Sequence, residues 1–191
     1  MIKIGKNLSE WSSYSCKPKT KEELEKIIED RISKEGLNCD LNDIDTSLIT
    51  DMSGLFYDMR FNGDISRWNV SNVTNMTSMF AESTFNDDIS RWNVLNVTKM
   101  SNMFFMSKFN GDISNWDISN VENMRCMFYN AEFNQDISKW DTSNVKNMSY
   151  TFFRAKFNHD ISNLKINKDC ITNSMFCECS IKDEYKPTLP E

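Results

Sequence analysis

The sequence predicts an α/β repeat solenoid of six back-to-back 24-residue units, preceded by a helical cap. The dipeptide Phe-Asn recurs every 24 residues, at 61, 85, 109, 133 and 157, and the same phase extends back to Leu37-Asn38. Each unit also repeats the same apolar positions, and residues 1–36 lie outside the repeat. A fixed period of this length is typical of stacked units, because each unit buries its apolar face only against its neighbours.

The six units follow one another without insertion, so residues 37–180 form one repeat region. They run 37–60, 61–84, 85–108, 109–132, 133–156 and 157–180. We number the positions of each unit from 1 to 24. The shared motif is Phe-Asn-x-Asp-Ile-Ser-x-Trp-(Asn/Asp)-(Val/Ile/Thr)-Ser-Asn-Val-x-Asn-Met-x-x-Met-Phe, followed by four variable residues. Position 8 is Trp in four units and position 20 is Phe in all six, so we expect these columns to stack inside the core.

Spacing within a unit predicts one short parallel strand and one short helix. Ile65-x-x-Trp68-x-Val70 ends in the alternation of period two that is typical of a strand. Met76, Met79 and Phe80 follow at i, i+3 and i+4, which is one face of about two helical turns. One strand and one short helix per unit is the plan of leucine-rich repeats. We therefore predict a leucine-rich-repeat-like solenoid.

Residues 1–36 are predicted to cap the first unit, with a helix at about 20–34. Thr20-Lys21-Glu22-Glu23 is a capping box, and Gly36 offers a stop signal. The apolar face of this helix comprises Leu24, Ile27, Ile28 and Ile32. Residues 181–191 are predicted to form a C-terminal tail, because the repeat pattern ends at 180.

The repeated motif resembles the mycoplasma-type repeat of unknown function found in BspA-like leucine-rich-repeat surface proteins of bacteria. The resemblance covers about residues 37–180. It implies a right-handed solenoid used for adhesion or other protein contacts, often at a cell surface. It supplies no catalytic residues to transfer to this chain.

Charge and composition narrow the classes of partner. There are 28 acidic and 22 basic residues, and the formal charge of -6 repels nucleic-acid phosphates, so we expect no nucleic-acid partner. No stretch approaches the roughly 20 apolar residues that span a bilayer, so no membrane insertion is expected. The start of the chain, residues 1–7, lacks the apolar core of a signal peptide, which favours the cytoplasm or a removed leader. The resemblance instead favours a surface or secreted location, and both remain open.

No residue pattern predicts a cofactor, a metal or catalysis. The six cysteines recur at no fixed unit position, so we interpret them as free thiols in a reducing compartment. The single histidine, His159, and the spacing of Cys177-Glu-Cys179 do not suit a zinc site. His159 lies at a variable turn position. Without a catalytic triad, a phosphate-binding loop or a nucleophile elbow, we expect no enzyme.

Unit positions 7, 9 and 11 point outward from the predicted strand and provide the candidate binding surface. Their side chains are not needed for packing, so they are available for a protein partner, whose identity and oligomeric arrangement the pattern leaves open. The candidate binding residues are Arg67, Asn69, Arg91, Asn93, Leu95, Asn115, Asp117, Lys139 and Asp141. The predicted function is a non-enzymatic protein-binding or adhesion module.

Two alternative functions and one further surface stay open. The Asp column at position 4 and the Asn column at position 2 are interpreted as turn caps, or else as calcium ligands of a calcium-stabilised adhesin. A structural or self-assembling role through exposed terminal sheet edges would show concentration-dependent association, lost on removing the N-terminal cap helix. The aromatic residues at position 21 either cover the edge of the core or form an exposed strip; they are Tyr57, Phe105, Tyr129 and Phe153.

Overall fold

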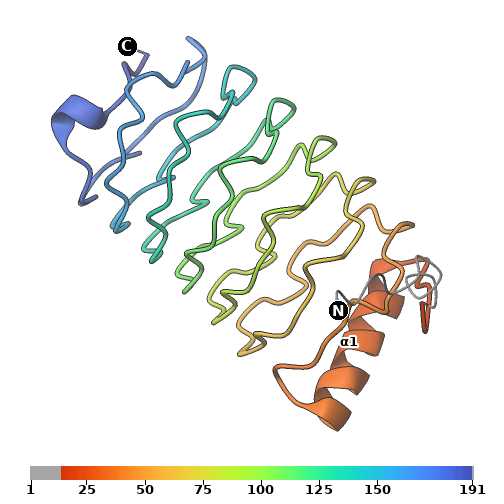
Figure 1. Cartoon of the computed structure of the whole chain (residues 1–191). Coiled ribbons are helices and arrows are strands. Elements are labelled where there is room, and N and C mark those ends of the chain that lie inside the picture. The colour runs from red at the N-terminus through yellow and green to blue at the C-terminus, as the bar shows by residue number, and fades with distance from the viewer. Residues whose placement is uncertain (1–13, 191) are drawn as a thin grey trace, which may run out of the picture.

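The computed structural model describes residues 14–190 and shows a stack of irregular coils (Figure 1). Each 24-residue unit makes one coil, and we number the coils 1 to 6 along the chain. A single α-helix, α1 (Lys21–Glu35), lies across the end of the stack at coil 1. Within residues 14–190 the only other helical element is one 3-10 turn, η2 (Asp183–Tyr185). The first part of the predicted cap, residues 1–13, and residue 191 lie outside the described residues.

The predicted α/β plan of one strand and one short helix per unit is wrong. Within the described residues, β contacts are limited to isolated parallel bridges. Five of these bridges join position 15 of successive coils, which lies outside the predicted strand: Asp51, Asn75, Lys99, Asn123, Asn147 and Ile171. Positions 5–10, predicted as the strand, form turns instead, such as the bond from Trp68 N–H to Ile65 C=O at 3.1 Å. The coils therefore do not have the strand-and-helix architecture of leucine-rich repeats.

Hydrogen bonding at positions 16–20 explains why the predicted helix does not form. The N–H of Met79 donates to Met76 C=O at 3.2 Å, three residues back, and so closes a turn. The N–H of Phe80 donates to Met103 C=O in the next coil at 2.9 Å, whereas a helix would bond it to Met76. N–H groups at alternate positions thus donate to carbonyls of the next coil, and the N–H groups between them close turns within their own coil. These consecutive turns place Met76, Met79 and Phe80 on one side, which gives the same i, i+3, i+4 spacing of apolar residues as a helix.

Two residues of every unit adopt the left-handed backbone region, which interrupts any continuous helix. In coil 2 these are Ser78, with φ 55°, and Glu82, with φ 58°. The same two positions, 18 and 22, have positive φ in all six coils: Gly54, Asp58, Ser78, Glu82, Asn102, Met106, Cys126, Asn130, Tyr150, Arg154, Ser174 and Glu178. The coil therefore bends at these positions instead of continuing as a helix.

The expected stacking of tryptophan inside the core is confirmed. The rings of Trp68, Trp92 and Trp116 stack on one another with centroids 6.5 Å apart, and each is at most 4% exposed. Each indole N–H also donates to the position 5 carbonyl of the preceding coil, as Trp92 Nε1 does to Ile65 O at 3.2 Å. The column thus needs an aromatic ring with a hydrogen-bond donor, which explains the choice of Trp over Phe.

Phenylalanine fills the second core column, and backbone bonds join the coils beside it. Phe80 and Phe104 stack at 5.7 Å and are fully buried. At each of the five coil junctions, the N–H groups at positions 16, 18, 20 and 22 donate to carbonyls at positions 15, 17, 19 and 21 of the next coil, over 2.7–3.1 Å. Every coil is therefore held to the next by stacked rings and by four repeated backbone bonds.

Helix α1 forms close to the predicted span of 20–34. Thr20 caps its start, because the Thr20 hydroxyl accepts the N–H of Glu23 at 3.3 Å. Leu24 and Ile28 are buried against coil 1. The helix ends at Glu35, and the C-cap residue Gly36 has a φ of 91°, which favours glycine. The helix thus covers the apolar end of the stack.

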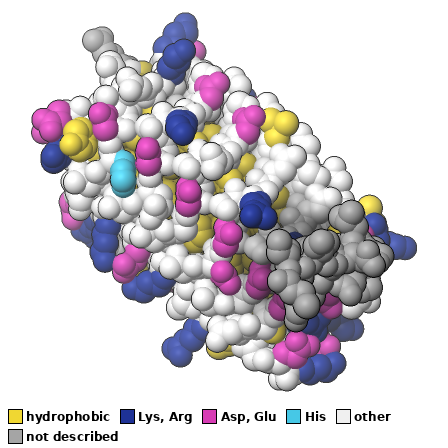
Figure 2. Space-filling view, viewed as in Figure 1, with side chains coloured by type: hydrophobic (Ala, Val, Ile, Leu, Met, Phe, Trp, Pro, Cys, Tyr) yellow, Lys and Arg dark blue, Asp and Glu magenta, His cyan; other side chains and the backbone are white. Residues whose placement is uncertain are grey.

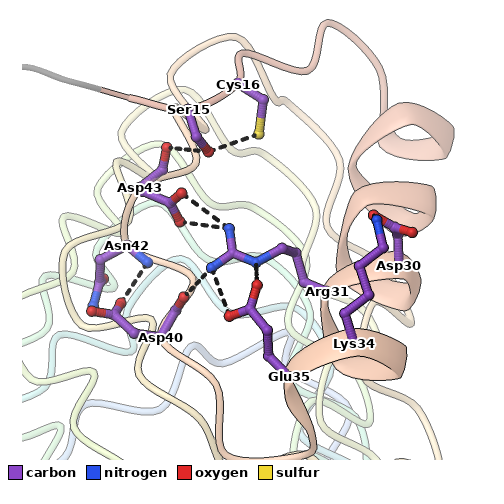
Figure 3. A network of polar contacts seen from close by, with 9 residues as sticks. All are labelled: Ser15, Cys16, Asp30, Arg31, Lys34, Glu35, Asp40, Asn42 and Asp43. Atoms are coloured by element: carbon purple, nitrogen blue, oxygen red, sulfur yellow. Dashed lines mark hydrogen bonds and ion pairs between the residues drawn. The ribbon is translucent and has the colours of Figure 1, made fainter.

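A polar network fastens α1 to coil 1 (Figure 3). The Arg31 guanidinium donates to both carboxylate oxygens of Asp43, at 2.9 and 3.0 Å, and to Asp40 C=O at 2.8 Å. Hydrogen bonding to Glu35 on the same helix raises the pKa of Arg31, so the guanidinium stays charged. The N–H of Ser15 donates to Asp43 C=O at 2.7 Å, so the segment before the helix also adds to coil 1.

The chain after residue 180 folds back onto coil 6. The N–H of Ile161 donates to Tyr185 C=O at 3.0 Å, and the N–H of Lys182 donates to the Asn158 side chain at 3.2 Å. Phe176 in coil 6 nevertheless stays partly exposed, unlike the phenylalanines of the inner coils. The division of the chain into cap, repeats and tail stays a prediction.

Candidate functional site

Each coil has corners at which an Asp or Asn side chain accepts the backbone N–H two residues further on. In unit 61–84 these side chains are Asp64, Asn69 and Asn75, at unit positions 4, 9 and 15, with distances of 2.9 to 3.1 Å. Short polar side chains stabilise tight turns in this way, because they replace the acceptor that a helix or sheet would supply. The corners determine which side chains face outward.

The Asp column at position 4 caps turns, as predicted. Each Asp accepts the N–H two residues on at 2.8 to 3.0 Å: Asp40, Asp64, Asp88, Asp112, Asp136 and Asp160. The Asn column at position 2 joins neighbouring coils instead, since the Asn62 side chain accepts the N–H of Asn86 at 2.6 Å. Within residues 14–190, no three His, Cys, Asp or Glu side chains gather as metal ligands would. The calcium alternative stays a prediction.

Hydrogen bonds lower the pKa of carboxylates in the Asp column, as Asp88 and Asp112 show. Hydrogen bonds from Ser90 lower the pKa of Asp88, and the cation of Arg91 lowers it further. The Ser114 N–H that Asp112 accepts lowers the pKa of Asp112, whereas the neighbouring carboxylates of Asp88 and Asp136 raise it. On the face shown in Figure 2, acidic side chains follow a diagonal line along the stack, and His159 lies beside it. This face therefore presents a row of negative charge with basic side chains beside it (Figure 2).

All nine predicted binding residues are exposed, although on turns and not on a strand. They are Arg67, Asn69, Arg91, Asn93, Leu95, Asn115, Asp117, Lys139 and Asp141. Arg67 and Arg91 occupy the same position in neighbouring coils, directly before the stacked rings of Trp68 and Trp92. We call the exposed side chains at position 7 the lateral row: Arg67, Arg91, Asn115, Lys139 and Asn163. The row follows the stack beside the Asp column.

The position 9 residues of the predicted site have a structural role. The side chains of Asn69, Asn93, Asp117 and Asp141 each accept the N–H of position 11 at 3.0 to 3.2 Å. Hydrogen bonds from Ser119 lower the pKa of Asp117, so its capping oxygen stays charged. The predicted site therefore divides into turn caps at position 9 and outward side chains at position 7.

Sequence reasoning missed the asparagines at position 12. Their side-chain N–H groups donate to the position 11 carbonyl of the preceding coil at 2.7 to 2.9 Å: Asn72, Asn96, Asn120 and Asn144. The signal was present, because Asn recurs at this exposed position in four successive units. One of these bonds holds Leu95 C=O, which fixes the turn that exposes 39% of the Leu95 side chain.

The aromatic residues at position 21 form a half-buried ladder. Phe105 and Tyr129 stack at 4.8 Å, and Tyr129 and Phe153 stack at the same distance. The Arg154 guanidinium lies 5.1 Å from the Phe153 ring centroid, while Tyr57, at the other end of the column, is 50% exposed. Stacking therefore occupies the ring faces, and the ladder chiefly covers the edge of the core.

The six cysteines are free of disulfides. Cys39, Cys126 and Cys170 are buried, and burial raises the pKa of each thiol. Neither helix in residues 14–190 has the length and apolar character that a bilayer span requires.

Two overlapping stretches, residues 23–132 and 105–185, match one family model, described as Mycoplasma protein of unknown function, DUF285. The chain belongs to the DUF285 family. The matches include α1 from residue 23 and all six coils, so DUF285 membership confirms the mycoplasma-type repeat. No curated protein and no solved structure shows significant similarity to this DUF285 chain.

Proposed function

We propose that this DUF285 chain is a non-enzymatic protein-binding module that offers the lateral row to a protein partner. One observation supports this most. Within residues 14–190, the side chains of Arg91, Asn115 and Lys139 are exposed and make no hydrogen bond or ion pair. Side chains that neither pack in the core nor cap a turn are available to contact a partner protein. The residue type in the lateral row also differs among the coils, as a specific contact surface requires.

The basic side chains of the lateral row and the acidic Asp column beside it together fit a partner that carries both positive and negative charge. Arg67 lies 3.8 Å from Asp40 and is still 52% exposed, so its guanidinium reaches both the Asp column and solvent. Hydrogen bonds from Ser90 and Ser138 are the main causes that lower the pKa of Asp88 and Asp136, and the cations of Arg91 and Lys139 add to the effect. Arginine is enriched among residues that dominate binding energy, because its planar group stacks and forms paired hydrogen bonds. Arg67 and Arg91 are therefore the residues we expect to contribute most.

We propose, on the repeat motif alone, the finer assignment to BspA-like bacterial surface proteins and a role in adhesion. The motif resembles the mycoplasma-type repeat of those proteins, and the exposed lateral row is compatible with contacts to another protein. The proposal includes no leucine-rich-repeat architecture, since the coils are built of turns.

Charge reversal at Arg67 and Arg91 tests the proposed function. We expect Arg67→Glu with Arg91→Glu to weaken partner binding at least about tenfold, because two exposed contacts reverse sign. The melting temperature should stay unchanged, since neither side chain is part of the core. Partners captured from an extract of the source organism, and then purified, would be titrated against each variant.

A matched control makes the same change in charge elsewhere. Lys26→Glu with Lys99→Glu alters two exposed lysines outside the lateral row and should leave affinity within about twofold. Equal loss of affinity in both double variants would show a general charge effect and contradict the proposal. A fall in melting temperature confined to the Arg67 and Arg91 variant would show that these residues are structural.

A further inference from the structure

The same backbone connection is repeated at every junction of the stack. At the last junction, the N–H groups of Met148, Tyr150, Phe152 and Arg154 donate to carbonyls of coil 6 at 2.8 to 3.1 Å. The four earlier junctions use the same unit positions. One edge of each coil is thus a row of four donors, and the facing edge of the next coil is a row of four acceptors.

Coil 6 has this donor row without an acceptor. We call it the C-terminal edge: the N–H groups of Thr172, Ser174, Phe176 and Glu178. Within residues 14–190, these four groups donate no hydrogen bond. Four unpaired N–H groups in the register of an inner junction are a ready template for a further backbone segment.

The side chains beside the C-terminal edge are also left incomplete. Phe176 stacks on Phe152 at 5.6 Å, yet its ring stays partly exposed, with the Lys186 ammonium 5.9 Å from its centroid. Ile171, at the start of the same segment, is 50% exposed. Thr172 replaces the Met that fills position 16 in the five preceding coils. An added segment with its own Phe would cover the ring as the inner coils do.

The chain itself shows that coil edges take up added segments. At coil 1, Ser15 and Cys16 exchange backbone hydrogen bonds with Asp43 and Asp45, at 2.7 and 2.9 Å. At coil 6, the tail bonds to Ile161 through Tyr185 and, within residues 14–190, leaves the N–H groups at positions 16, 18, 20 and 22 without a hydrogen bond. Addition of a segment through its backbone is therefore a mode of contact already used at both ends of this fold.

We propose that the C-terminal edge docks a coil segment of the same 24-residue repeat, supplied by a different polypeptide whose first coil is uncovered. The four N–H groups require carbonyls that follow the bent path of positions 15–21, and the repeat itself has that path. A straight strand does not, because left-handed residues bend the edge at Ser174 and Glu178.

A second unmodified copy of this chain is not the occupant. The matching acceptor row of coil 1 belongs to Asp51, Ser53, Leu55 and Tyr57, whose carbonyls also accept no backbone hydrogen bond from residues 14–190. Helix α1 covers this end, however, since Met52 and Leu55 are buried at it, and Lys21 contacts Ser53 at 3.3 Å. The unmodified chain should therefore stay monomeric.

The test uses the full chain and a synthetic peptide of residues 73–84. In the intact chain, this stretch supplies the acceptors of coil 2, at positions 15, 17, 19 and 21, and carries Phe80. Amide hydrogen exchange of the full chain would be followed by NMR with increasing peptide. We expect exchange at Thr172, Ser174, Phe176 and Glu178 to slow at least about tenfold, because each amide gains a bond. The equivalent amides one coil earlier should not change.

Variants at Thr172 provide a matched pair. Thr172→Pro removes one docking N–H, which holds no bond in the free chain, and should weaken peptide binding at least about fivefold. Thr172→Val keeps the N–H and should bind like the parent. If Thr172→Pro fails to fold, the amide protection of the parent chain still decides the question.

Three results would overturn the proposal. The four amides could stay unprotected at saturating peptide concentration. A scrambled peptide of the same composition could protect them equally. Finally, the unmodified chain alone could become protected there as its own concentration rises, which would identify a second copy as the occupant.

Discussion

Asparagine and aspartate exchange freely at unit position 9, where the side chain caps a turn. Asn69 and Asn93 accept the same N–H bond as Asp117 and Asp141. The role needs one acceptor oxygen on a short side chain, which both residues supply. The negative charge of Asp at position 9 is therefore not needed for the turn cap, and an Asp→Asn substitution can remove the charge while it keeps the cap.

Substitutions at Asp117 test that separation. Asp117→Ala should lower the free energy of unfolding by about 1 kcal/mol, because the turn N–H loses its partner. Asp117→Asn should keep the cap. Urea unfolding at neutral pH measures both, and equal destabilisation by the two variants would contradict a role that depends on one oxygen.

The same variants predict a pH dependence. Hydrogen bonds from Ser119 lower the pKa of Asp117 below its ordinary value of 3.8. A lowered pKa in the folded state gives stability that is present above 3.8 and is lost as the pH falls through the lowered value. Asp117→Asn removes this titration, so its stability should fall less than that of the parent over that acidic range. Parallel pH profiles of the two chains would contradict the assignment.

Helix α1 depends for its stability on packing against the end of the stack at coil 1. A helix of this length is marginal in isolation, and its buried face contributes chiefly Leu24 and Ile28. The Arg31 guanidinium adds hydrogen bonds to two groups of coil 1, the Asp43 carboxylate and Asp40 C=O. Lysine cannot reproduce that fork, because its ammonium is a single donor centre.

Arg31→Lys should therefore loosen the cap while the inner coils stay folded. We expect a loss of about 2 kcal/mol in the free energy of unfolding, since bonds to a partly buried charged group are lost. Lys34→Met is the matched control, because Lys34 pairs with Asp30 on the helix itself at 2.7 Å. That change should cost less than about 0.5 kcal/mol. Equal losses, measured by urea unfolding, would show that the network does not hold α1.

At the scale of the whole molecule, stacking could be predicted from sequence and the path of the chain could not. Columns such as Trp68 and Trp92 must recur once per coil whatever the local structure, so their period predicts that they meet. Turns and helices both place Met76, Met79 and Phe80 on one side, and hence the apolar pattern did not distinguish them. The left-handed residue at position 18 is glycine in coil 1, as Gly54, but is Ser78 in coil 2 and Asn102 in coil 3. A repeated glycine, which would have predicted a left-handed turn, is therefore missing from the motif.

The candidate site could also be predicted only in part: the exposure of its side chains followed from the sequence, whereas the turn caps at position 9 did not. Outward exposure of Arg67, Arg91 and Lys139 followed from the inward columns beside them. Turn capping by the position 4 column was predictable from the chemistry of Asp. The caps at Asn69 and its equivalents were not recognised, because the strand prediction had assigned their backbone to a sheet.

The bond from Phe80 to the next coil tests the central claim most directly. Scalar coupling across hydrogen bonds in solution NMR identifies the carbonyl that accepts each N–H. Stacked, turn-built coils predict coupling from Phe80 N to the carbonyl carbon of Met103, across the 2.9 Å bond between coils. Coupling from Phe80 N to Met76 instead would show an α-helix in the repeat and contradict this fold.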